Sequence, residues 1–254
     1  MSDISKNEYG KDFNRIFITG DTHGDFGYVM SADCKYRFSE SDLIIILGDV
    51  GLNFSNDERD SQRKHDVMKR FPCTFLCLHG NHEMRPDSEG ILCKYEKKDW
   101  FGGQVFVQKK YDRLLFAVDG SRYHINGRDF LVIGGAYSID KFIRIERGWP
   151  WFPDEQLTYE EKKTIRAEIN GHGNHEDIIL THTCPYDFRP TDMFLPGYDQ
   201  STVDTTSEWF LQHIYDDLAG NFTDWYCGHW HLERDLDDKS FHFLFHYFKQ
   251  VKGE

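Results

Sequence analysis

The chain has 254 residues, of which 39% are hydrophobic and 16% aromatic, and its formal net charge at pH 7 is −13. This composition indicates a folded protein, and the length suffices for one α/β domain with a sizeable core. The acidic balance argues against binding of extended nucleic acid through a basic surface. It leaves a metal-dependent nuclease open, because bound cations add positive charge locally.

No apolar stretch approaches the roughly 20 residues of a membrane span, and residues 1–15 lack the apolar core of a signal peptide. The six cysteines form no C-x-x-C pair and several lie in or near apolar runs. We therefore expect reduced thiols and a cytoplasmic protein without a membrane partner. With no repeat or low-complexity linker, the sequence predicts a single domain over 1–254, with about 1–13 as a flexible N-terminal tail.

Short apolar runs rich in β-forming residues recur along the chain, and nearly all of them end in a polar cluster. The runs that predict strands lie at 15–19, 43–47, 74–78, 130–133, 177–180, 224–227 and 241–245. The first six continue into GDTHGD, GDVG, HGNHE, GGAYS, THTCP and GHWH, respectively. The last run is expected to be half buried, with His242 on its polar side.

Helical patterns lie between some of these strands, at 57–70, 154–169 and 205–220. The second carries a capping box formed by Thr158 and Glu161. The third is expected to end near Gly220 and to bury one face formed by Trp209, Phe210, Ile214 and Leu218. Strands alternating with helices predict an α/β architecture, in which ligands gather beyond the carboxyl ends of the strands.

The polar clusters at those strand ends contain side chains that can ligate a metal or move a proton. Oxygen and imidazole donors together suit divalent Mn, Fe, Zn, Co or Ni, and the donors are too many for one tetrahedral ion. Each residue taken singly has a structural alternative, such as capping a turn or packing in the core. The candidates are Asp21, His23, Asp49, Asn81, His82, His182, His229 and His231.

The order of these blocks resembles the calcineurin-like metallophosphoesterases, whose signature is D-x-H, GD, GNH[DE], a lone His after a strand, and GHxH. Here the blocks are Asp21–His23, Gly48–Asp49, Gly80–Glu83, His182 and Gly228–His231. They span about residues 16 to 231, and joint coincidence in this order is improbable. The resemblance implies an α/β fold, namely a four-layer α/β/β/α sandwich of two mixed β-sheets flanked by helices, with a dimetal site at one edge.

The resemblance also implies a role for each residue. One metal would be held by Asp21, His23, Asp49 and His231, and the other by Asp49, Asn81, His182 and His229. Asp49 would bridge the ions, and a metal-bound hydroxide would attack phosphorus. His82 would be the general acid that protonates the leaving oxygen. The implied cofactors are two divalent ions, with Mn favoured and Fe, Zn, Ni or Co as alternatives.

The chain departs from the Ser/Thr protein phosphatases of this superfamily, which carry GDxVDRG after the second strand. Leu52 stands where the Asp that partners the catalytic His would be, and Asn53 stands where the phosphate-binding Arg would be. His79 replaces the Arg that usually precedes GNHE. The GHxH ending instead resembles the phosphodiesterase and nuclease branches.

Substrate contacts must therefore come from elsewhere, and the segment 134–153 follows a strand toward the site edge. Its Tyr137, Arg144 and Arg147, together with Arg85 after GNHE, are candidate substrate-binding residues. An arginine could clamp phosphate and an aromatic ring could stack on a base. The alternative is that Trp149 and Trp151 pack under a loop while the arginines are solvated.

A second GNHE, at 173–176, precedes a strand instead of following one, so Asn174 and His175 are expected in a loop at the opposite sheet edge. The histidines that match no block are interpreted as surface or core residues. They are His65, His79, His124, His172, His213, His242 and His246.

The sequence thus predicts a metal-dependent phosphoesterase that hydrolyses a phosphate mono- or diester, with a small or medium substrate that is nucleotide-like. The alternatives are a Ser/Thr protein phosphatase, a nuclease and, from another class, a non-catalytic metal-binding interaction scaffold. The sequence predicts neither the oligomeric state nor the physiological substrate.

Overall fold

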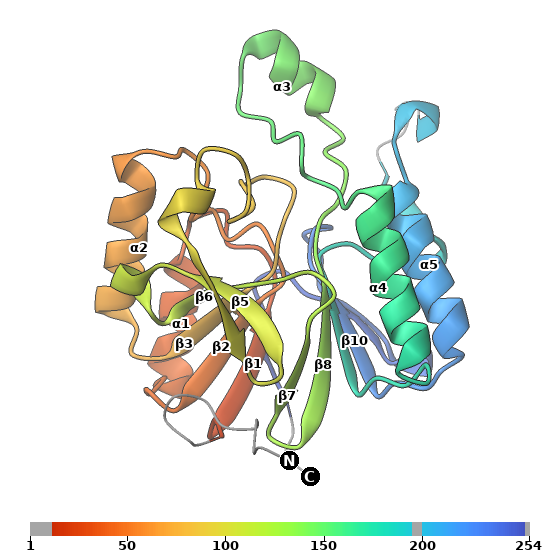
Figure 1. Cartoon of the computed structure of the whole chain (residues 1–254), viewed down its shortest axis with the longest axis horizontal. Coiled ribbons are helices and arrows are strands. Elements are labelled where there is room, and N and C mark those ends of the chain that lie inside the picture. The colour runs from red at the N-terminus through yellow and green to blue at the C-terminus, as the bar shows by residue number, and fades with distance from the viewer. Residues whose placement is uncertain (1–11, 195–199, 252–254) are drawn as a thin grey trace.

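The computed structural model describes residues 12–194 and 200–251, so most of the expected N-terminal tail lies outside the described residues. Two mixed β-sheets pack face to face, with helices on the outer face of each (Figure 1). The helices are α1 (Gly27–Tyr36), α2 (Glu58–Arg70), α3 (Lys141–Arg147), α4 (Tyr159–Gly171) and α5 (Thr206–Leu218). Short 3₁₀ turns lie at 92–94, 109–111, 186–188, 191–193, 200–202 and 237–239.

The first sheet has the order β13-β1-β2-β3-β6-β5-β4. Its strands, in that order, are Lys249–Gln250, Arg15–Thr19, Asp42–Ile46, Thr74–Cys77, Leu114–Ala117, Gly103–Val107 and Glu96–Trp100. The second sheet has the order β11-β12-β10-β9-β8-β7. Its strands are Arg234–Leu236, Phe241–Phe243, Asp224–Cys227, Ile178–Thr181, Arg128–Ile133 and Arg122–Ile125.

The central strands of each sheet are parallel. In the first sheet β1, β2, β3 and β6 run together, with Phe17 opposite Ile44 and Ile44 opposite Phe75. In the second sheet β8, β9, β10 and β12 run together. The carboxyl ends of the parallel strands in each sheet therefore lie on the same side of that sheet. The predicted site residues stand in the loops directly after these strand ends.

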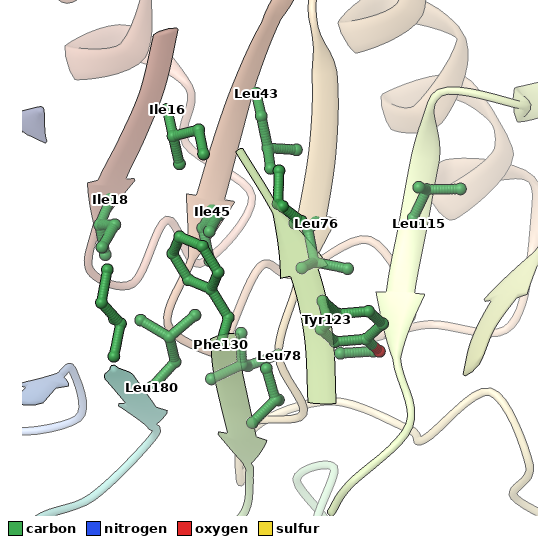
Figure 2. Packing of buried hydrophobic residues seen from close by; sticks show 14 of the residues in the cluster. Ile16, Ile18, Leu43, Ile45, Leu76, Leu78, Leu115, Tyr123, Phe130 and Leu180 are labelled. Atoms are coloured by element: carbon green, nitrogen blue, oxygen red, sulfur yellow. The ribbon is translucent and has the colours of Figure 1, made fainter. Parts of the chain in front are cut away.

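Three apolar clusters explain the layers. One lies between the sheets, where Ile18 and Ile45 of the first sheet share a cluster with Phe130 and Leu180 of the second (Figure 2). Another covers the outer face of the first sheet and includes Val29 of α1 and Val67 of α2. The third covers the second sheet with residues of α4 and α5. The predicted four-layer α/β/β/α sandwich is confirmed.

The elements predicted from apolar runs are present, with shifts of a few residues at their ends. The capping box forms as predicted, because Glu161 N–H donates to the Thr158 hydroxyl and the Glu161 carboxylate accepts from Thr158 N–H. The predicted face of α5 is wrong at one position. Trp209 is 44% exposed and stacks on Tyr186 with ring centroids 4.0 Å apart, and Leu211 is buried with the other apolar residues.

Several elements have no clear signal in the sequence. Strand β4 consists of mostly exposed charged residues and is stabilised by its pairing with β5. Strand β13 is two residues long and pairs with the edge of β1. None of the helices among the described residues is both long and apolar enough to cross a membrane. The six cysteines are all free, and four of them are buried.

Candidate metal centre

The structure brings the eight predicted site residues together at the carboxyl ends of strands from both sheets. The loops after β1, β2 and β3 carry Asp21, His23, Asp49, Asn81 and His82, and those after β9 and β10 carry His182, His229 and His231. The ligand atoms of Asp21, His23 and His231 lie within 4.8 Å of one another. Those of Asp21, Asp49 and His182 meet the same limit.

The first group converges on the Asp21 carboxylate, which is buried. His231 Nε2 lies 3.2 Å from Asp21 Oδ2, and His23 Nε2 lies 3.7 Å from the same oxygen. The two imidazole Nε2 atoms are 2.9 Å apart. The other oxygen of Asp21 accepts the backbone N–H of His229, which fixes the carboxylate relative to the last block.

A second group of donors consists of Asn81, His182 and His229. The Asn81 Oδ1 atom lies 2.8 Å from His182 Nε2 and 3.0 Å from His229 Nδ1. His182 Nδ1 lies 2.7 Å from the carbonyl oxygen of Leu47 and must donate to it. A neutral His182 therefore presents a lone pair at Nε2, directed at another acceptor, Asn81 Oδ1. Two lone pairs facing each other in a buried site repel, and a cation held between them removes that repulsion.

Asp49 lies between the two groups and is 1% exposed. Its Oδ1 accepts the backbone N–H of His82, whereas its Oδ2 is buried and has no hydrogen-bond partner among the described residues. That oxygen is 3.7 Å from His182 Nε2 and 4.0 Å from His23 Nε2, one residue from each group. An orphaned carboxylate oxygen in this position fits a metal ligand, because a buried acceptor without a partner is otherwise costly.

The backbone of the site is unusual in the same residues. His23, Asp49, His229 and His231 have φ of 48°, 46°, 64° and 49°, in the left-handed region that few non-glycine residues adopt. Gly80 is required for packing, since a Cβ there would overlap the Asp49 side chain and backbone. Strain concentrated in four candidate ligands is typical of a functional site.

Comparison with known proteins agrees with this geometry. The family model of calcineurin-like phosphoesterases matches residues 14–233. The chain belongs to this family. It is therefore a hydrolase of phosphoester bonds that uses divalent metal ions, and the donor set described above suits such ions.

Among curated protein sequences no relative matches this phosphoesterase. Solved structures with a similar arrangement include the phosphopantetheinyl hydrolase of Mycobacterium tuberculosis, at 16% identity and TM-score 0.47, covering 90% of this chain and 87% of that one. Protein TT1561 of Thermus thermophilus has 12% identity and TM-score 0.46, covering 94% and 99%. A putative 5'-nucleotidase from Staphylococcus aureus has 12% identity and TM-score 0.46, covering 93% of this chain and 50% of that chain.

The side chains of the phosphoesterase site differ in the direction in which their pKa values are shifted. Burial alone would raise the pKa of Asp21, but the hydrogen bond to His231 and the neighbouring histidines lower it to about 2. The same hydrogen bond raises the pKa of His231. Burial beside His182 holds the pKa of His229 well below its usual value. These shifts favour an ionised Asp21 and a neutral His229. A carboxylate and an imidazole bind a metal ion in these forms.

His82, the predicted general acid, lies beside the metal groups with its ring centroid 5.9 Å from that of His23. Burial lowers the pKa of its imidazole, and the charge of Arg144 lowers it further, whereas Asp49 raises it. His82 follows Asn81 directly, so the backbone that places the amide also places the imidazole at the site. Its role as general acid stays a prediction.

The four predicted substrate-binding residues lie in different surroundings. Arg85 is already paired with Asp87, Asp119 and Glu161, at 3.0 to 3.4 Å. Arg144 pairs with Asp140 at 2.7 Å, and Arg147 lies over the Trp149 ring at 5.0 Å. Tyr137 is buried, with the Lys141 ammonium 5.7 Å from its ring centroid. These roles remain predictions, and Arg85 has the least freedom to take one.

Helix α3, to which Arg144 and Arg147 belong, projects from the rest of the molecule (Figure 1). Large apolar side chains on and around it are exposed, namely Ile139, Phe142, Ile143, Ile145 and Trp149. The alternative in which Trp149 packs under a loop is therefore wrong, whereas Trp151 is half-buried and donates to Glu155 Oε2 at 2.9 Å.

The positions that depart from the protein-phosphatase pattern are buried. Leu52 is fully buried, and Asn53 Oδ1 accepts from Lys64 Nζ at 2.7 Å and from the Tyr95 hydroxyl at 2.6 Å. Burial lowers the pKa of the Lys64 ammonium to about 8. Asn53 thus belongs to an interior polar cluster and presents no group to a phosphate.

The second GNHE segment lies in the loop between α4 and β9, at the end of the sheet opposite His182, as expected from its order. Asn174 has a φ of 51° and follows the end of α4. Glu176 is fully buried and paired with Arg122 Nη2 at 2.6 Å. This segment has a structural role, which separates it from Asn81 and His82.

Sequence reasoning missed three residues that support the site. Glu83, the last residue of the first GNHE, accepts the backbone N–H groups of Val50 and Gly51 and so holds the loop that carries Asp49. Ser138 accepts from Asn81 Nδ2 at 2.9 Å, and burial raises the pKa of the nearby Glu155 while Ser138 opposes that rise. A serine and a glutamate in a long loop carry no spacing signal, so only the folded structure reveals them.

Proposed function

We propose that this phosphoesterase is dinuclear, with Asp49 as the bridging ligand. One ion would be held by Asp21, His23, Asp49 and His231, and the other by Asp49, Asn81, His182 and His229. The observation that carries the proposal is the buried Asp49 Oδ2, which faces an imidazole of each group and has no hydrogen-bond partner in the part of the chain that the structure describes. A carboxylate with one free oxygen between two donor sets suits a shared position.

Two divalent ions bound at such a site supply Lewis-acid activation of water and neutralise charge on the phosphate. The chain's own residues would then place the ester. His82 would protonate the leaving oxygen, a role that suits an imidazole beside the metal groups, with its ring centroid 5.9 Å from that of His23. Arg144 and Arg147 belong to the projecting helix α3, and the charge of Arg144 lowers the pKa of His82, so these guanidinium groups are our candidates for binding phosphate oxygens.

We propose a small or medium phosphate mono- or diester as the substrate, with a nucleotide-like leaving group. Exposed aromatic rings near α3, including Phe142 and Trp149, support this by offering surfaces on which a planar group can stack. The burial of Leu52 and Asn53 weighs against a protein phosphatase. The net charge of −13 weighs against a nuclease that grips a duplex.

We further propose Mn²⁺ as the working metal and a cytoplasmic location. The mixed oxygen and imidazole donors suit Mn²⁺ and its neighbours in the series. The free cysteines suit a reducing compartment.

The test is hydrolysis of p-nitrophenyl phosphate and bis-p-nitrophenyl phosphate, with added Mn²⁺ and with chelator. The wild type is compared with Asp49→Asn and with Asp238→Asn, a matched control at an exposed carboxylate. Turnover that needs Mn²⁺, is lost in Asp49→Asn and persists in Asp238→Asn supports the proposal, and the faster ester gives the preference. Absence of turnover together with fewer than two bound ions per chain would refute the dinuclear assignment.

A further inference from the structure

A series of four stacked rings runs from His231, a candidate ligand of the first ion, away from the metal groups. Phe245 stacks on His231, His246 stacks on Phe245, and Tyr28 stacks on His246. The ring centroids are 4.5, 3.7 and 4.4 Å apart, and the ring planes are inclined by 19°, 20° and 29°. We call these four side chains the ring stack. Its members come from α1 and from the segments that follow β10 and β12.

The far end of the ring stack is anchored to the loop that carries Asp21. The Tyr28 hydroxyl donates to the Gly20 carbonyl oxygen at 3.1 Å. Gly20 N–H in turn donates to the Phe245 carbonyl oxygen at 3.1 Å. At the near end, His231 Nε2 lies 3.2 Å from Asp21 Oδ2. The ring stack therefore connects the loops of two candidate ligands of the first ion through contacts within the protein.

Glu233 fixes the backbone that carries the middle of the ring stack. Its Oε1 atom accepts three consecutive backbone N–H groups, those of Phe245, His246 and Tyr247, at 3.1, 2.6 and 2.8 Å. Hydrogen bonds from N–H groups to a carboxylate are stronger than those between neutral groups. Glu233 lies two residues after His231 in the sequence. These hydrogen bonds therefore join the loop of a candidate metal ligand to the segment of Phe245.

His231 differs from His182 in what orients its imidazole. The His231 side chain is 46% exposed, and within the described residues its hydrogen bonds are made by Nε2, the atom directed at the metal position. Metal-bound histidines are usually oriented by a hydrogen bond at the other ring nitrogen. His182 has such a bond, from Nδ1 to the Leu47 carbonyl oxygen. In His231 the flat face of Phe245 takes the place of that hydrogen bond.

The contact with Phe245 restrains the torsion that moves the ligand atom. Rotation about the Cβ–Cγ bond of a histidine has only broad minima, and it displaces Nε2. A nearly parallel ring at 4.5 Å limits this rotation, because tilting the imidazole brings its edge against Phe245. We propose that Phe245 is a positioning residue, which fixes the plane of the His231 imidazole and so raises the affinity for the first ion. This inference rests on the proposed dinuclear site.

The test removes the flat ring and then restores it. Phe245→Leu keeps an apolar contact without a ring, whereas Phe245→Tyr keeps the ring. Tyr247→Leu, on the same segment and 69% exposed, is the matched control. Metal-free protein is titrated with Mn²⁺ at pH 8, and free Mn²⁺ is followed by electron paramagnetic resonance. Phe245→Leu should bind one of the two ions about 3- to 10-fold more weakly, the range expected for the loss of one aromatic pair, and the other two variants should stay within about twofold of the wild type.

A second background separates positioning from a general disturbance of the loops. His231→Ala leaves no imidazole to orient, so adding Phe245→Leu to it should weaken binding of the first ion by less than about twofold. If Phe245→Leu causes the same loss in this background as in the wild type, Phe245 acts through the structure of the loops and not through His231. That result would overturn the inference.

The outcomes distinguish this inference from the proposed function. If the wild type binds two ions and hydrolyses the ester, but Phe245→Leu binds both ions with unchanged affinity, the positioning role is wrong and the dinuclear site stands. Equal weakening in Phe245→Leu and Phe245→Tyr would also overturn the inference, because the flat ring would not be the cause. If the wild type binds fewer than two ions, the proposed function itself fails, and the inference fails with it.

Discussion

Replacing Asp49 with Asn should stabilise the metal-free protein while removing the stabilisation that metal provides. Asp21 and Asp49 are both 1% exposed, and their ligand atoms lie within 4.8 Å of each other. Without a cation, two buried carboxylates repel at this distance. Asp49→Asn removes one charge and keeps the shape, and its amide oxygen can still accept the His82 N–H that Asp49 Oδ1 accepts now.

The size of the effect follows from Coulomb's law. Two unit charges no more than 4.8 Å apart at an effective dielectric constant of about 20 repel by at least about 3 kcal/mol. His231 offsets part of this through its contact with Asp21. The new amide NH₂ can also donate to His182 Nε2, which lies 3.7 Å from Asp49 Oδ2. We expect the free energy of unfolding of the metal-free protein to rise by about 1–3 kcal/mol, or about 2–4 °C in Tm per kcal/mol.

The assay is urea unfolding followed by far-ultraviolet circular dichroism at pH 8, with chelator and with excess Mn²⁺. A ligand at 100 times its Kd stabilises a folded protein by about 2.7 kcal/mol. The wild type should gain about this much from Mn²⁺, and Asp49→Asn should gain little. The order of stability should therefore reverse between the two conditions, while Asp238→Asn follows the wild type in both.

One result would refute this reasoning directly. If Asp49→Asn is less stable than the wild type in chelator, the unpartnered Asp49 oxygen is not a source of repulsion in the metal-free site. The same conclusion would follow if Mn²⁺ stabilised both proteins equally, because Asp49 would then contribute nothing to metal affinity.

Three further predictions concern single side chains. His82→Gln should lower the turnover of phenyl phosphate by about 10²- to 10⁴-fold. The loss should be smaller with p-nitrophenyl phosphate, because its leaving group needs no proton, and steady-state kinetics at equal metal content test this. Lys64→Met should raise the free energy of unfolding at pH 7 by about 1–3 kcal/mol, because burial lowers the pKa of Lys64 to about 8. This gain should shrink above pH 8, where Lys64 of the folded wild type releases its proton. Burial lowers the pKa of His242, but hydrogen bonds to Asp224 and Asp235 raise it overall; urea titrations should therefore show that His242→Asn costs about 1 kcal/mol at pH 5.5, and that the cost disappears as the pH rises through the folded-state pKa.

The site could be predicted from the sequence because each donor follows a run of β-forming residues. Parallel strands place their carboxyl ends at one edge, so residues far apart in the sequence, such as Asp21 and His229, were expected to meet. The second GNHE was separated from the first by the same rule, since it precedes β9. The pattern of β-forming runs followed by polar residues therefore predicted both the donor residues of the site and the strand ends at which they lie.

The supporting residues could not be predicted in this way. Ser138 accepts a hydrogen bond from Asn81 across 57 positions of the chain, and a serine at this place in the sequence does not signal such a contact. Helix α3 was missed because its apolar side chains are exposed, so no buried face marks it. Trp209 was misplaced because helical periodicity cannot distinguish the buried face of α5 from a ring that stacks on Tyr186 at the surface.

Backbone hydrogen bonds cross-link the loops that carry the candidate metal ligands. His23 N–H donates to the Asp49 carbonyl oxygen at 2.7 Å, and Gly228 N–H donates to the His182 carbonyl oxygen at 3.0 Å. Strained, left-handed residues such as His23 and Asp49 persist only where surrounding contacts over-determine them. These cross-links tie the loop of His23 to that of Asp49 and the loop of His229 to that of His182, so we expect the repulsion between Asp21 and Asp49 to relax little by loop movement. The stability gained in Asp49→Asn is therefore a direct measure of how rigidly the fold prepares the site.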